Sequence, residues 1–152
     1  MLPVSANAAE QLCIERTLPA PRSLVYRAFT EPERMLQWFG PHGFVATLAQ
    51  LDVRAGGAWR GGMRGPDGKE RIASGVYREV VPEQLLVFTY AWETDGRRGH
   101  ETLCRVELSD LADGRQTRLI FRQGPFETSE AAVGHQGGWR EAFEKLASKV
   151  AS

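Results

Sequence analysis

From residue 43 to about residue 123, the chain alternates between apolar and polar side chains with a period of two. This period is typical of β-strands, because successive side chains of a strand point to opposite faces of a sheet. The clearest strand covers residues 84–92, and its large inward-facing residues are Leu86, Phe88, Tyr90 and Trp92. Turn-forming sequences such as GPDG at 65–68 divide the region into six strands. Six strands joined by short turns predict an antiparallel meander with one covered face.

Helical periodicity brackets this region on both sides. A first strand at residues 10–18 precedes two short helices between residues 21 and 39. After the meander, we expect a long helix that begins at Ser129, which can cap it. One apolar stripe runs along that helix at three- and four-residue spacing and consists of Trp139, Ala142, Phe143, Leu146 and Val150. The sequence therefore predicts an α+β fold of order β-α-α-β6-α, with a curved antiparallel sheet wrapped on the C-terminal helix.

Length and composition restrict the class of protein. A chain of 152 residues with 42% hydrophobic and 25% charged residues fits one folded domain. We expect that domain at residues 10–152, after a disordered lead-in at residues 1–9. Nineteen basic and nineteen acidic residues give zero formal charge, which argues against nucleic-acid binding. The two isolated cysteines, and the lack of a signal peptide or a long apolar span, predict a cytoplasmic protein that does not insert into membranes.

Seven short motifs, in order along residues 10–150, resemble a known family. They are 21–33 (PRSLVYRAFTEPE), 37–41 (QWFGP), 52–57 (DVRAGG), 65–68 (GPDG), 75–82 (GVYREVVP), 86–92 (LVFTYAW) and 134–139 (GHQGGW). Together they are similar to the activator of heat-shock protein 90 ATPase homologue family, in its Aha-type C-terminal domain. That family belongs to the START-like, or SRPBCC, superfamily, so the resemblance implies a helix-grip fold. One departure is the sequence Phe121-Arg122-Gln123, where relatives often carry a histidine.

The resemblance also implies a function, because START-like proteins hold lipids, sterols, polyketides or other apolar ligands between sheet and helix. The co-chaperones that give the family its name have an additional N-terminal domain, which we expect this chain to lack. We therefore expect binding of a small apolar or amphipathic ligand. The alternatives are an interaction module for a heat-shock protein 90 partner and an enzyme of the cyclase or hydratase type.

The expected ligand-binding residues are large side chains of the covered face and of the final helix. They are Trp38, Trp59, Met63, Phe88, Tyr90, Phe121, His135, Trp139 and Phe143. They would surround a cavity of about 300–1,000 Å³, unless they simply fill the core. Gly137 and Gly138 either let the helix approach the sheet closely or leave room at the cavity mouth, unless they break the helix before Trp139.

Candidate catalytic groups are few. His42, His100 and His135 lie far apart in the sequence and lack the spacing of a zinc site. His135 stands four residues before Trp139, so on a continuous helix it shares that face and could act as a general base. We nevertheless expect no catalytic residue, no metal and no cofactor, and a protein that is a monomer or a weak dimer.

Overall fold

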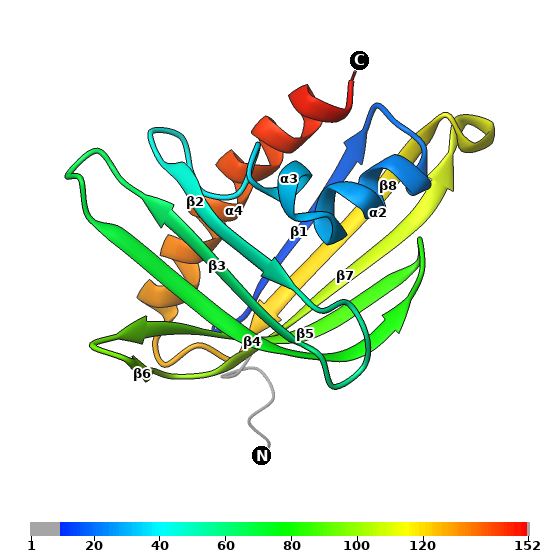
Figure 1. The fold of residues 1–152 in the computed structure, drawn as a ribbon. Coiled ribbons are helices and arrows are strands. Elements are labelled where there is room, and N and C mark those ends of the chain that lie inside the picture. The colour runs from blue at the N-terminus through cyan, green and yellow to red at the C-terminus, as the bar shows by residue number, and fades with distance from the viewer. Residues whose placement is uncertain (1–9, 152) are drawn as a thin grey trace.

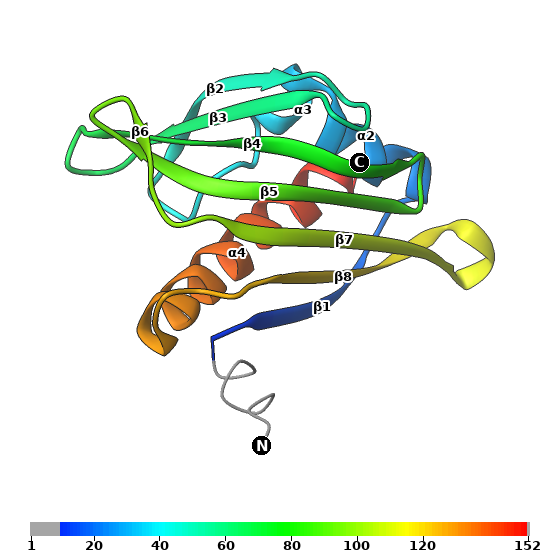
Figure 2. The ribbon, with the colours of Figure 1, turned by 90° about the horizontal axis from the view of Figure 1, so that it is seen from below.

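The predicted meander is present in the structure. The computed structural model describes residues 10–151, so the expected lead-in at residues 1–9 lies outside the described residues. The long strands are β1 (Leu12–Leu18), β2 (Val45–Leu51), β3 (Ala58–Arg64), β4 (Glu70–Val81), β5 (Leu85–Thr94), β7 (Thr102–Leu111) and β8 (Gln116–Gly124). They form one antiparallel sheet in the order β1-β8-β7-β5-β4-β3-β2 (Figure 2). A two-residue strand that the sequence did not predict, β6 (Arg97–Arg98), pairs with the end of β5.

The sheet is strongly curved, and β-bulges contribute to the curvature. The register shifts between β2 and β3 near Ala46 and between β4 and β5 near Tyr77. At Gly75 in β4 a side chain would collide with the Thr89 carbonyl group of β5, so only glycine fits there. The indole N–H of Trp59 donates to the same carbonyl oxygen at 2.9 Å.

Three helices lie on the concave side of this sheet (Figure 1). The short helices α2 (Arg22–Thr30) and α3 (Pro32–Met35) follow β1 directly, and a single 3₁₀ turn, η1 (Ala112–Gly114), joins β7 to β8. The long helix α4 (Ser129–Val150) crosses the concave face. Its N-cap is Thr128 and not the predicted Ser129, because the Thr128 hydroxyl oxygen accepts from the Ala131 amide at 3.0 Å. The fold is thus the predicted helix-grip arrangement.

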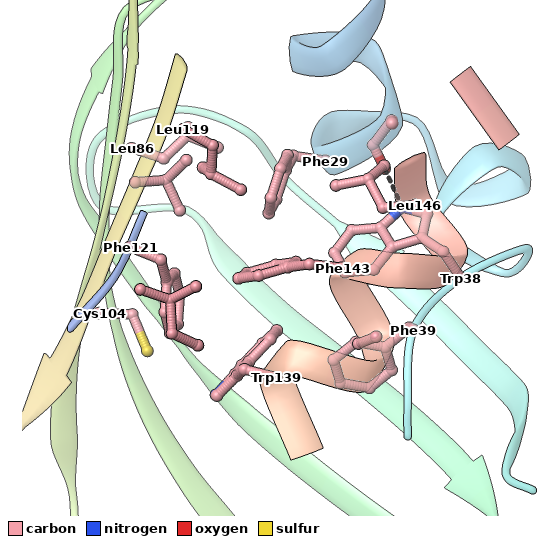
Figure 3. Packing of buried hydrophobic residues seen from close by; sticks show 14 of the residues in the cluster. Phe29, Trp38, Phe39, Leu86, Cys104, Leu119, Phe121, Trp139, Phe143 and Leu146 are labelled. Carbon is pink, nitrogen blue, oxygen red and sulfur yellow. Dashed lines mark hydrogen bonds between the residues drawn. The ribbon is translucent and has the colours of Figure 1, made fainter. Parts of the chain in front are cut away.

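The apolar stripe of α4 forms the centre of the core. Phe143 packs between Phe121 of β8 and Trp38 of the segment after α3, with ring centroids 5.3 and 6.2 Å away (Figure 3). Phe143 and Leu146 are fully buried. Helix α4 continues through Gly137 without interruption, so the alternative of a helix break there is wrong. Within residues 10–151, no helix combines the length and the apolar character needed to cross a membrane.

Candidate functional site

A pocket of about 150 Å³ lies beside the N-terminal half of α4, and we call it the main pocket. Strand β3 contributes Met63, and β5 contributes Tyr90 and Trp92. Helix α4 contributes His135 and Trp139. A small hollow of about 30 Å³, room for one water molecule, shares Tyr90 and Trp139 with the main pocket. The larger of these two spaces therefore lies beside the N-terminal half of α4.

Residues 39–44, here called the covering segment, close the main pocket on one side. Phe39 and Phe44 of this segment both line the pocket. Two of its glycines, Gly40 and Gly43, have φ angles of +111° and +84°, which other residues adopt with strain. The sequence between the end of α3 and β2 can therefore turn sharply enough to place both rings over the pocket.

Polar contacts hold the covering segment against α4. The His42 amide donates to Glu141 at 3.0 Å, and the His42 ring nitrogen Nε2 lies 3.1 Å from Glu144. Lys145 donates to the Phe44 carbonyl oxygen at 3.3 Å. His42 and Glu144 are both about half exposed, so such contacts contribute little stability each. The exposed part of the segment around His42 is thus held by weak, solvent-accessible interactions, whereas Phe39 anchors the start of the segment in the core.

All four tryptophans of the chain use their indole N–H groups inside the protein. Trp38 donates to the Ala28 carbonyl oxygen and Trp59 to that of Thr89. Trp92 donates to His135, and its Nε1 lies 3.2 Å from Nε2 of the histidine. These bonds orient the rings that line the pockets and leave no indole donor free for a ligand.

Gln123 at the end of β8 fixes the remaining indole. The Trp139 indole N–H donates to its Oε1 at 2.7 Å, while its Nε2 donates to the Thr102 hydroxyl at 2.9 Å. That hydroxyl donates in turn to the Tyr90 carbonyl oxygen at 3.3 Å. Gln123 is 2% exposed, so this chain of hydrogen bonds satisfies polar groups that burial would otherwise penalise. Gln123 thus positions one wall of the main pocket through its hydrogen bond with Trp139.

His135 is held as a neutral ring at physiological pH. Burial lowers its pKa, because the charged imidazolium loses hydration in a partly buried site. Its Nε2 accepts from Trp92, so in the neutral ring the proton sits on Nδ1. Its ring also packs on Phe126, with centroids 4.7 Å apart. The histidine therefore belongs to the aromatic wall rather than to an acid/base pair.

The structure separates the residues predicted for the site into three groups. Met63, Tyr90, His135 and Trp139 line the main pocket. Trp38, Trp59 and Phe88 line the small hollow, together with Tyr90 and Trp139. Phe121 and Phe143 line neither space and are fully buried in the core.

Sequence reasoning missed several residues of the main pocket. Trp92 had a signal, since it alternates on the same strand face as Tyr90. Phe44 had none, because it reaches the pocket through the path of a loop. Arg71 of β4 and Gly134 of α4 had none either, because neither is a large apolar side chain. The volume of about 150 Å³ is also below the expected range of about 300–1,000 Å³.

The chemistry of the main pocket is almost entirely apolar. No Asp or Glu lines it, and its one charged residue is Arg71, whose guanidinium lies 5.3 Å from the Phe44 ring centroid. Within residues 10–151, no group of three or more His, Cys, Asp or Glu side chains could hold a metal ion. No carboxylate that could pair with His135 as an acid/base partner lines this pocket.

Comparisons with known proteins identify one family and several solved structures with the same fold. The family model for the Activator of Hsp90 ATPase homolog 1-like protein matches residues 19–151. A solved structure from Chromobacterium violaceum is 26% identical, with a TM-score of 0.84, and covers 94% of this chain and 98% of its own. The protein named AHSA1 from Silicibacter pomeroyi is 28% identical, with a TM-score of 0.82 and coverages of 93% and 97%. A third structure, from Nitrosomonas europaea, is 28% identical, with a TM-score of 0.78 and coverages of 93% and 94%. The search among curated proteins found no match.

Proposed function

Since the chain belongs to the Activator of Hsp90 ATPase homolog 1-like protein family, we propose that it binds a small apolar or amphipathic molecule in the main pocket. The observation that carries this proposal is an apolar hollow between the sheet and α4. Aromatic rings from β5, α4 and the covering segment line a space of about 150 Å³. Ligand pockets are typically concave and mostly apolar, with a few polar groups.

The position of Gly134 indicates that a ligand can enter the main pocket at the N-terminal half of α4. This residue lines the main pocket and is exposed, and a Cβ atom built on it would meet no atom within 4 Å. A ligand could therefore enter beside this helix and the weakly held part of the covering segment. Loops held by few buried contacts are the parts of a protein that open most readily.

Thermal-shift screening against small apolar compounds tests the proposal. A ligand that binds only the folded protein stabilises it by about 2.7 kcal/mol at 100 times its Kd. Gly134→Leu should abolish the shift, because the new side chain occupies the mouth of the pocket. Gly137→Leu is the matched control, since a Cβ there also meets no atom within 4 Å but Gly137 does not line the pocket. Compounds that stabilise both variants equally would place binding elsewhere, and a screen without any ligand would count against the proposal.

The family description offers a second candidate function, association with a heat-shock protein 90. It predicts a change in the ATPase rate of a cognate heat-shock protein 90 when this protein is added. Because such an effect would use a surface and not the main pocket, Gly134→Leu should leave it unchanged. The two functions are thereby separable with one variant.

A further inference from the structure

The volume of the main pocket restricts the size of a ligand, whereas the apolar lining of the pocket restricts only its polarity. This inference rests on the proposed function, because it takes the main pocket as the binding site. An apolar cavity of about 150 Å³ accommodates one benzene molecule, and the main pocket has about this volume. Drug-sized ligands require about 300–1,000 Å³. A single aromatic ring therefore fits within the main pocket, whereas a sterol or a long acyl chain would have to extend beyond it.

The polar groups around the pocket are nearly all engaged within the protein. The indole N–H groups of Trp92 and Trp139 donate to His135 and Gln123, as described above. Arg71 donates to Asp67 at 3.0 Å and so is paired with a carboxylate. A ligand therefore finds few free polar partners here.

Two donors are exceptions: the Nδ1–H of His135, whose Nε2 alone is hydrogen-bonded among residues 10–151, and the hydroxyl of Tyr90. The Tyr90 side chain is buried, at 3% exposure, and it lines both the main pocket and the small hollow. Its hydroxyl has no hydrogen-bond partner among residues 10–151, yet no fully enclosed side-chain nitrogen or oxygen in that range lacks one. The hydroxyl is therefore not fully enclosed, and it can be reached from one of the spaces that Tyr90 lines, which include a groove beside His100 and Phe126. Burial raises the pKa of Tyr90 well above its usual range, so the hydroxyl stays protonated and available as a donor.

The charge around the pocket argues against a cationic ligand. Aromatic rings can attract quaternary ammonium groups, but no carboxylate lines this pocket to balance such a charge. The one charged lining residue, Arg71, is itself a cation. A neutral ligand with a hydrogen-bond acceptor matches both the free donors and the absence of lining carboxylates.

We propose that the main pocket binds a neutral single-ring aromatic compound with one acceptor oxygen, and that this oxygen accepts a hydrogen bond from the Tyr90 hydroxyl. The ring fills the apolar space among the aromatic side chains, and the oxygen satisfies a donor that the protein leaves free. Tyr90 is thus the residue that distinguishes an oxygenated ring from a hydrocarbon of the same shape.

Two probes of the same shape test this assignment. Acetophenone carries a carbonyl oxygen, whereas α-methylstyrene has a methylene group in its place. Their Kd values are measured by calorimetry on the full chain and on Tyr90→Phe. The substitution should weaken acetophenone binding about tenfold, because its carbonyl group is then buried without a donor. Binding of α-methylstyrene should change less than twofold.

A second measurement uses only the unmodified protein. The infrared carbonyl stretch of bound acetophenone should shift to lower frequency than in hydrocarbon solvent, as expected for a hydrogen-bonded carbonyl group. Phenyltrimethylammonium and decanoic acid complete the probe set and represent a cation and a long acyl chain.

The outcomes separate this inference from the proposed function. If Tyr90→Phe leaves acetophenone binding unchanged and the carbonyl stretch does not move, the role of Tyr90 is wrong although the pocket binds ligands. If decanoic acid or phenyltrimethylammonium binds and neither acetophenone nor α-methylstyrene does, the ligand class is wrong and the proposed function stands. If none of the four probes binds, the main pocket is no binding site for such molecules, and both proposals fail.

Discussion

The two halves of α4 lie on the same sheet face but pack in opposite ways. The C-terminal half places Phe143 and Leu146 against the sheet with no exposed surface left (Figure 3). The N-terminal half carries Gly134, Gly137 and Gly138 within the same unbroken helix. Residues 134 and 146 are about 18 Å apart along the axis, at about 1.5 Å per residue. The main pocket thus arises beside the glycines of an unbroken helix, with His135 and Trp139 of the same half in its wall, and not where the helix is missing.

The largest expected effect comes from removing an anchor of the packed half. Phe143→Ala should lower the free energy of unfolding by about 3–5 kcal/mol, because it leaves a cavity where a fully buried ring was. Phe44→Ala, which shortens a half-buried ring over the main pocket, should cost less than half as much. Urea denaturation of both variants measures the difference. Equal losses would mean that the two halves are packed alike and would contradict the comparison.

A smaller effect of opposite sign is expected in the hollow half. Gly137→Ala should raise the free energy of unfolding by up to about 1 kcal/mol, since alanine favours the helix and the new methyl group meets no atom within 4 Å. Gly138→Ala should gain less, because its Cβ would meet the Pro41 ring at 3.4 Å. The same urea titrations rank the two variants. A loss of stability in Gly137→Ala would show that this part of α4 is more tightly packed than it looks.

Periodicity was enough to predict the fold. Alternation along β5 and the stripe on α4 each follow from one element, so the sheet, the helix and their contact face could be predicted from sequence alone. The glycines at 137–138 also marked the hollow half, and the structure keeps them in an intact helix. The short strand β6 carried no such signal, because two residues are too few to show a period.

The detailed wall of the pocket could not be predicted in this way. The hydrogen bond between Gln123 and Trp139 joins β8 to α4, and its geometry depends on how the two elements pack. Phe44 reaches the pocket because of the left-handed turns at Gly40 and Gly43, which a pattern of apolar residues does not encode. Such contacts depend on loop paths and side-chain rotamers, and these are fixed only in the folded chain.

The last expected effect is confined to low pH and concerns His135, a titratable residue in the hollow half of α4. Burial lowers the pKa of this imidazole in the folded protein, whereas an unfolded histidine titrates near pH 6.5. Above that pH both states are neutral and His135 adds no pH dependence. As the pH falls below about 6.5, the unfolded chain takes up the proton first. The free energy of unfolding should therefore decrease, by at most about 1.4 kcal/mol per pH unit for one proton.

Urea denaturation at pH 7.5, 6.5 and 5.5 measures this slope, and two substitutions assign it. His135→Gln keeps an oxygen that can accept from the Trp92 indole but does not titrate in this range, so the curve should flatten. His100→Gln replaces an exposed histidine outside α4 and should leave the low-pH loss in place. If His135→Gln keeps the full slope, the loss of stability comes from other groups. The hollow half is then wet enough to hydrate a charged imidazolium at position 135.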